Sequence, residues 1–320
     1  MFIYRKKVKK VSSLRGEFFK MMMRRQNINP IIHPEMEKKM KEMSDKYSYI
    51  RKKRGYNIEC LTTSNGTKYQ LLRKEGKKGY NKAIYYIHGG CYRCGLTYNY
   101  RDFVAPFCDI NEGMDIILLD YKLAPESRFP VQHDEAMDLW DEIKDKYGED
   151  NVIIGGDSSG GNLVLSILLK LRDKGRKLPK GCFLLSPWTD LTALGNSYKT
   201  NYKKDVEIGD ANGIFDDDTR KKLLDSYLFD YIGDADRYSP YVSPAYAEFK
   251  DFPAMLIFVG GDEMLLDDSR IVYNKAKNAG VDIELEIKPG MFHSYVLYQN
   301  FMPESRDSYK KLKRFIERVL

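Results

Sequence analysis

The sequence predicts an α/β fold with a central, mostly parallel sheet flanked by helices. Short apolar runs alternate along the chain with stretches of helical periodicity, which is typical of a parallel sheet. Most of these runs are apolar at consecutive positions rather than at every second one, as expected of strands buried on both faces. No internal repeat or low-complexity linker interrupts the 320 residues, a length that suits one large α/β unit.

Eight strands are expected in this sheet. Two early segments, Tyr56–Thr62 and Thr67–Leu72, flank Asn65-Gly66, a pair that favours an antiparallel hairpin. Six apolar runs follow: Ala83–Ile87, Asp115–Leu119, Val152–Ile154, Cys182–Leu185, Met255–Val259 and Ile283–Ile287. Because these six are separated by helical stretches, we expect them to form the parallel part of the sheet.

The helical stretches have one apolar face and many charged residues on the other. They are His133–Tyr147, Asn162–Lys174, Ser269–Ala279 and Arg306–Val319. Two regions, 1–55 and 190–245, do not fit the alternation of strand and helix. We expect both to form a helical cap over the carboxyl-terminal edge of the sheet, where open α/β sheets bind ligands. Residues 56–189 and 246–320 then form the core.

The net charge of +7 comes from the N-terminus, since residues 1–25 hold nine Lys or Arg and one Glu. The rest of the chain is close to neutral, which argues against a nucleic-acid-binding surface. We expect the N-terminal segment to be an amphipathic helix packed on the body by Phe18, Phe19 and residues 21–23. Its positive charge would also allow this segment to bind peripherally to an anionic membrane.

The sequence favours a cytoplasmic protein without a cofactor. The N-terminus lacks the apolar stretch of a secretory signal, and no apolar run approaches the ~18–20 residues of a membrane span. The five cysteines, an odd number, argue for reduced thiols. Cys91 and Cys94 form a CxxC pair, but the second pair that a zinc site requires is missing.

The strongest signal for chemistry is the segment GDSSGGN from Gly156 to Asn162. It matches G-x-S-x-G and lies between an apolar strand and an apolar helix, the context in which this motif exposes a nucleophilic serine. We therefore predict Ser158 as the nucleophile. The glycines Gly156 and Gly160 leave room for the sharp turn. Ser159 is expected to contribute its backbone N–H.

A serine attacking a carbonyl creates an oxyanion that needs preorganised donors. His88, Gly89, Gly90 and Cys91 follow the strand Ala83–Ile87, which is where HGGG-type loops of lipases and esterases lie. The backbone N–H groups of this loop, chiefly those of Gly90 and Cys91, are the expected donors. Cys91 replaces the last glycine and should narrow the adjacent space, which favours short acyl groups. His88 is expected to be structural.

The serine also needs a base and an acid that orients this base. The chain has four histidines, and His293 follows the last predicted strand, from which a loop can return to the nucleophile. Asp262 ends the preceding strand and is predicted to orient His293, with Glu263 as its rival. Asp267 and Asp268 are expected to cap the next helix.

Together these motifs resemble the hormone-sensitive-lipase-like group of α/β-hydrolases, of the bacterial arylesterase and acetyl esterase kind. The resemblance covers roughly residues 80–295. The matching segments are HGGC from His88, DYKLAPE from Asp120 with Phe129-Pro130, GDSSGGN from Gly156, SPWTDL from Ser186, GDEMLLD from Gly261 and PGMFH from Pro289. It implies the α/β-hydrolase fold with a helical cap, a triad of Ser158, Asp262 and His293, and cleavage of short-chain carboxylic esters without a cofactor.

The expected function is therefore carboxylic ester hydrolysis through an acyl-enzyme intermediate, with a small-molecule ester as substrate. Two alternatives remain: an amidase or peptidase on the same fold, and a non-catalytic ligand receptor. The sequence is compatible with a monomer or a homodimer and does not identify the natural substrate.

Overall fold

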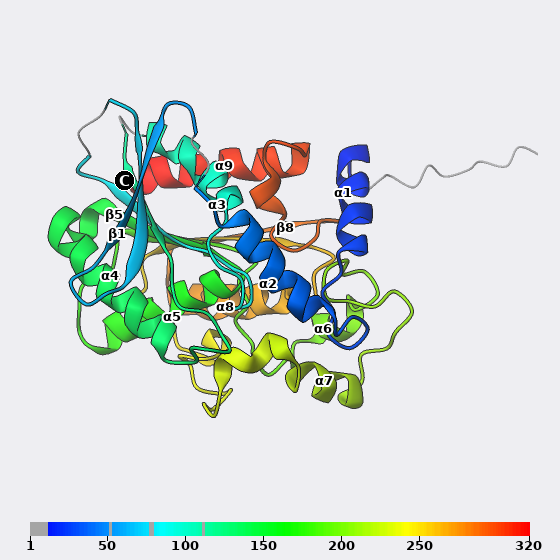
Figure 1. Cartoon of the computed structure of the whole chain (residues 1–320). Helices are drawn as coiled ribbons and strands as arrows, with labels where there is room; N and C mark the ends of the chain where they lie inside the picture. Colours follow the sequence, from blue (N-terminus) through cyan, green and yellow to red (C-terminus); the bar gives the residue numbers. More distant parts are fainter. Residues whose placement is uncertain (1–11, 51–52, 77–79, 111–112) are drawn as a thin grey trace, which may run out of the picture.

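The computed structural model describes residues 12–50, 53–76, 80–110 and 113–320. Eight strands form one sheet in the order β1-β2-β4-β3-β5-β6-β7-β8. Figure 1 shows this sheet between helices on its two sides. The strands are β1 (Tyr56–Thr62), β2 (Lys68–Lys74), β3 (Ala83–Ile87), β4 (Asp115–Leu119), β5 (Val152–Asp157), β6 (Gly181–Leu185), β7 (Ala254–Gly260) and β8 (Ile283–Lys288). β2 pairs antiparallel with β1 and β4, and the remaining pairs are parallel. The predicted eight-stranded, mostly parallel sheet is confirmed.

Helices cover both faces of the sheet. Alternate residues of the central strands pack against α4 (Val131–Tyr147), α5 (Ser159–Asp173) and α8 (Leu266–Asn278) on one face. The intervening residues of the same strands point to the other face, where they pack against α3 (Tyr98–Val104) and α9 (Pro303–Val319). β3 through β6 are completely buried, as their continuous apolar runs require.

The N-terminal segment and the insertion after β6 pack against each other. They contain α1 (Leu14–Arg25), α2 (Met36–Tyr47), α6 (Asn196–Thr200) and α7 (Asp217–Leu224). The Asn27 side chain donates to the carbonyl groups of Val206 and Gly209. The Tyr227 hydroxyl donates to the carbonyl of Ile28. These bonds join residues that are 179 to 199 positions apart in the sequence.

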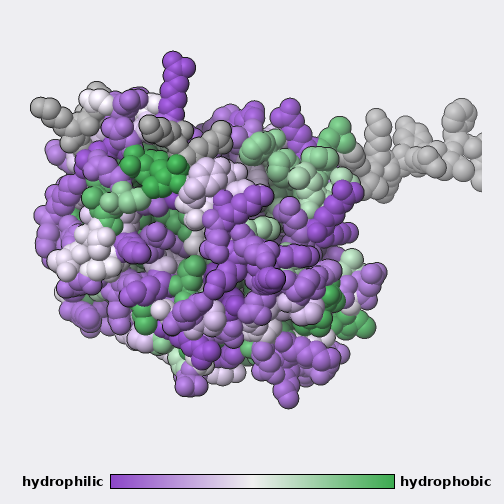
Figure 2. All heavy atoms as spheres, viewed as in Figure 1, coloured by the Kyte–Doolittle hydropathy of each residue, from purple (hydrophilic) through white to green (hydrophobic). Residues whose placement is uncertain are grey.

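The α1 helix packs on the body by fewer residues than expected. Phe19 contacts Tyr298 and Phe301, with ring centroids 5.6 Å apart in each pair. Phe18 and residues 21–22 are exposed instead and form an apolar patch over α1 (Figure 2). The expectation that they too anchor the helix is wrong. Part of the basic N-terminus, residues 1–11, lies outside the described residues.

Candidate active site

Ser158 lies on a sharp turn between β5 and α5. Its backbone has φ 51° and ψ −121°, a strained conformation for a residue with a side chain. The flanking glycines make this turn sterically possible. A Cβ atom at Gly160 would lie 2.1 Å from the carbonyl oxygen of Ile87, and one at Gly156 would lie 2.7 Å from the same atom. The local geometry predicted for the G-x-S-x-G segment is thus present.

His293 contacts a carboxylate on the loop after β7. Its Nδ1 lies 2.9 Å from Oε2 of Glu263. A carboxylate only accepts hydrogen bonds, so Nδ1 carries the proton and Nε2 is left to accept one. Glu263 is fully buried, and its other oxygen accepts hydrogen bonds from the Ser186 hydroxyl and the Gly260 N–H. Three donors therefore fix the carboxylate that orients the imidazole.

The prediction that Asp262 orients His293 is wrong. The Asp262 carboxylate accepts a hydrogen bond of 2.7 Å from Lys20 on α1 and is partly exposed. The chain turns immediately after β7: the Asp262 N–H donates to the carbonyl of Met291, and the Glu263 N–H donates to that of Gly260. This turn directs Glu263 inward, which spacing along the sequence could not reveal.

Ser186, at the end of β6, connects the serine turn to the histidine loop. The preceding residue, Leu185, accepts a hydrogen bond from the Ser158 N–H at 2.9 Å. The Ser186 hydroxyl donates to Glu263 at 2.7 Å and accepts from the Ser294 N–H at 3.0 Å. Ser158, Glu263 and His293 are thereby held at one edge of the sheet. The sequence indicated the SPWTDL motif but not this role of its serine.

The loop after β3 lies against the nucleophile turn. The Gly89 N–H donates to the Asp157 carboxylate at 3.0 Å, so the prediction that it is an oxyanion donor is wrong. The N–H groups of Gly90, Cys91 and Ser159 have no acceptor among the residues that the structure describes. Ser159 also fixes the loop, because its hydroxyl accepts from the Tyr92 N–H at 3.3 Å. Three amides thus remain available for an oxyanion.

His88 has a structural role, as expected. Its Nδ1 lies 2.8 Å from the carbonyl oxygen of Gly89, and its ring stacks on Tyr121 with centroids 4.3 Å apart. Burial lowers the pKa of His88 to about 4, so the ring is neutral. His133 is also buried, against the Tyr231 hydroxyl, at 2.8 Å.

Carboxylates surround His293 and favour its charged form. Burial opposes the charge, but Glu207 and Glu263 outweigh burial and raise the pKa of His293. The charge of His293 in turn acts on Asp157, the residue before the nucleophile. Glu207 lies in the insertion after β6, whose contribution to the site could not be read from the sequence pattern.

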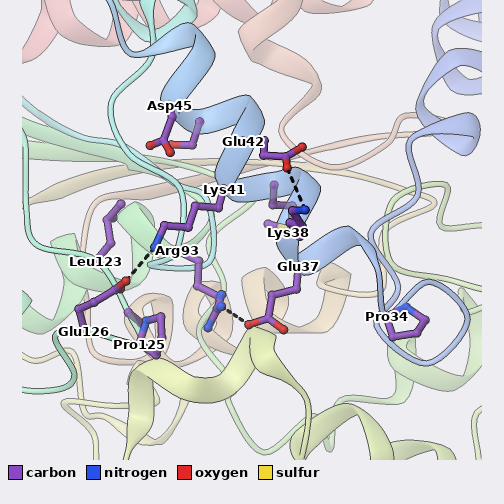
Figure 3. Close-up of a pocket in the computed structure, with 13 residues that line it drawn as sticks. Pro34, Glu37, Lys38, Lys41, Glu42, Asp45, Arg93, Leu123, Pro125 and Glu126 are labelled. Carbon is purple, nitrogen blue, oxygen red and sulfur yellow. Dashed lines mark hydrogen bonds and ion pairs between the residues drawn. The ribbon is translucent and has the colours of Figure 1, made fainter.

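A separate cavity of about 540 Å³ lies between α2 and the loop 123–126 (Figure 3). Its 13 lining residues include none of the triad candidates. Its charged side chains are mostly paired with one another, as in Arg93–Glu37 and Lys41–Glu126. The cavity is therefore distinct from the serine and histidine site.

Comparison with known proteins agrees with the fold and the motifs. A family model described as the alpha/beta hydrolase fold matches residues 84–297. An esterase of Acinetobacter venetianus is 30% identical over 72% of this chain and 73% of its own length. An acetyl-hydrolase of Streptomyces hygroscopicus is 30% identical over 70% and 72% of the two chains.

Solved structures extend the similarity to nearly the whole chain. An esterase from the bacterial hormone-sensitive lipase family superposes with a TM-score of 0.79 at 28% identity and covers 96% of this chain and 98% of its own. An esterase/lipase from an uncultured bacterium gives a TM-score of 0.79 at 29% identity, with 96% and 99% coverage. The chain therefore belongs to the α/β-hydrolase family and to its hormone-sensitive-lipase-like group.

Proposed function

We propose that the protein is a carboxylic ester hydrolase that uses Ser158, His293 and Glu263 as its catalytic triad. The observation that carries the proposal is the fixed imidazole: Glu263 holds Nδ1 at 2.9 Å, which leaves Nε2 to accept the proton of Ser158. The serine attacks the ester carbonyl, and the N–H groups of Gly90, Cys91 and Ser159 stabilise the oxyanion. The names of the relatives, esterase and acetyl-hydrolase, support ester substrates.

In the next steps the protonated imidazole donates its proton to the leaving alkoxide, and the acyl group stays on Ser158. Water, activated by the same His293, then releases the acid and restores the serine. Alcohol leaving groups need less assistance than amines, which favours esters over amides. The two capping segments, 1–55 and 190–245, are proposed to select the substrate.

A fluorophosphonate probe tests this proposal, because it reacts with an activated serine. We expect a single adduct on a peptide that contains Ser158, found by mass spectrometry, together with hydrolysis of p-nitrophenyl acetate. Labelling with hydrolysis of anilides but not of esters would indicate an amidase. No labelling and no hydrolysis would favour a ligand receptor.

The acyl preference is expected to be for two to four carbons because of Cys91. This residue adopts φ 55°, a conformation that glycine takes without strain, so Cys91→Gly should preserve the loop while removing the thiol. Each methylene group that the variant newly buries adds about 0.8 kcal/mol. The kcat/KM ratio of p-nitrophenyl octanoate to acetate should therefore rise about tenfold or more. An unchanged ratio would show that Cys91 does not limit the pocket.

The pH dependence should reflect the carboxylates around His293. The base must be neutral, and Glu207, Glu263 and Asp205 raise the pKa of His293 against the effect of burial. Activity should therefore rise with pH, with the midpoint of kcat/KM above the ~6.5 of an unperturbed imidazole. The profile is measured with a neutral ester after subtraction of spontaneous hydrolysis. A midpoint at or below that value would contradict the expectation.

The contact of the basic N-terminus with an anionic membrane stays a prediction. Among the described residues, no helix is both long and apolar enough to cross a membrane.

A further inference from the structure

Glu207 lies at a fixed position in the loop between α6 and α7. The Asp205 carboxylate accepts hydrogen bonds from the N–H groups of Glu207 and Ile208, at 2.9 and 3.1 Å, and from that of Met264, at 2.7 Å. The Glu207 carbonyl accepts from the Ile28 N–H at 2.7 Å. The loop is therefore attached both to the N-terminal segment and to the residue that follows Glu263.

The side chain of Glu207 is partly buried. Its carboxylate makes no hydrogen bond or ion pair with any residue in the described part of the chain. Its charge acts on His293, on Cys91 of the oxyanion loop and on Tyr298. The Glu207 carboxylate is therefore within electrostatic range of the base and of Cys91, in a loop that Asp205 joins to the residue after Glu263.

An unpaired carboxylate in such a place is costly, because burial penalises its charge. Burial raises the pKa of Glu207 to about 7; the charge of His293 opposes this rise, and the neighbouring carboxylates of Asp205, Glu263 and Asp157 add to it. Lys20, a cation on the adjacent helix α1, is already bound to Asp262. Catalysis requires a neutral His293, and in that state Glu207 loses this charge as well. A ligand with a positive charge would then supply a cationic partner and favour the ionised form of Glu207.

We propose that Glu207 is a specificity-determining residue that binds a cationic group of the substrate near the scissile carbonyl. The preferred substrates are then esters with an ammonium group in either the alcohol or the acyl part. This inference rests on the proposed ester hydrolysis and names its substrate class. The negative surroundings would also disfavour esters that carry a carboxylate.

Isosteric pairs of substrates test the charge alone. Acetylcholine and 3,3-dimethylbutyl acetate differ only by the ammonium nitrogen in the alcohol part. The p-nitrophenyl esters of 4-trimethylammoniobutyrate and 5,5-dimethylhexanoate differ in the same way in the acyl part. All four are assayed in alkaline buffer with the wild type and with Glu207→Gln, which keeps the shape and removes the charge.

For at least one pair, we expect the cationic-to-neutral ratio of kcat/KM to be about tenfold higher in the wild type than in Glu207→Gln, as one partly screened charge pair would give. Glu248→Gln makes the same change on the surface, where the Glu248 carboxylate is 81% exposed, and should leave both ratios unchanged. A residue that only tunes His293 would change the rates of both members of a pair alike. Equal ratios in the wild type and Glu207→Gln would overturn the proposal.

A binding measurement separates this inference from the proposed function. Tetramethylammonium should bind the wild type more tightly than Glu207→Gln in calorimetry, whether or not any ester is hydrolysed. Equal or absent binding, with neutral esters still hydrolysed and Ser158 still labelled, would reject the cation subsite and keep the esterase. Loss of labelling and of hydrolysis in the wild type would reject the esterase itself.

Discussion

Replacing Ser158 with alanine is expected to lower kcat for p-nitrophenyl acetate by a factor on the order of 10⁶, to the level of the solvent reaction plus the residual effect of binding. The variant lacks the oxygen that forms the acyl-enzyme, while the donors of Gly90, Cys91 and Ser159 remain. Alanine takes up the same backbone position without added bulk, so the melting temperature should change little. Burst kinetics with a p-nitrophenyl ester would measure the loss of the acylation step directly.

Ser159→Ala provides the matched control, because it removes a hydroxyl from the next residue. This variant keeps the backbone N–H and loses a hydrogen bond of 3.3 Å from Tyr92. We expect its kcat to fall by about tenfold or less, since a neutral hydrogen bond contributes about 1 kcal/mol. A larger loss of kcat in Ser159→Ala than in Ser158→Ala would show that Ser159, and not Ser158, is the nucleophile.

The sheet was predictable because burial alone determines its strands. The central parallel strands lie between two layers of helices, so their sequences are apolar at consecutive positions, as in Ala83–Ile87 and in residues 116–119. The helix Tyr98–Val104 was not expected, since its residues alternate aromatic and polar groups without a clear apolar face. Its buried residues are determined by tertiary packing, which leaves no helical periodicity of apolar residues in so short a segment.

The serine turn was equally readable, because its glycines are required by local backbone geometry. The acid was not, because Asp262 and Glu263 are adjacent carboxylates and the turn after β7 decides which one faces inward. The sequence also could not show that the Gly89 N–H is unavailable to an oxyanion, because this too depends on the folded structure. Its N–H is taken by Asp157, 68 positions away in the sequence, through a contact that exists only in the folded chain.

Glu263→Gln should lower kcat by a factor on the order of 10²–10⁴, whereas Asp262→Asn should leave it within about twofold. In the wild type, Oε1 of Glu263 accepts from Ser186 and from the Gly260 N–H, and Oε2 accepts from His293. A glutamine that keeps the first two bonds turns its amide NH₂ group towards Nδ1. Nδ1 must then accept, so the proton moves to Nε2 and the imidazole can no longer receive the serine proton.

Asp262→Asn is the matched control, since it neutralises the adjacent carboxylate. It removes the ion pair with Lys20, whose two side chains are 16% and 21% exposed, and should cost about 1–3 kcal/mol of stability because Lys20 is left partly buried without its partner. Values of kcat at saturating p-nitrophenyl acetate, with thermal melts to verify folding, compare the two variants. Nearly wild-type activity in Glu263→Gln with a large loss in Asp262→Asn would return the role of the acid to Asp262. In the wild type, kcat should fall at acidic pH as His293 becomes protonated. In Glu263→Gln the imidazole no longer acts as the base, so the residual kcat should lose this dependence on the protonation of His293.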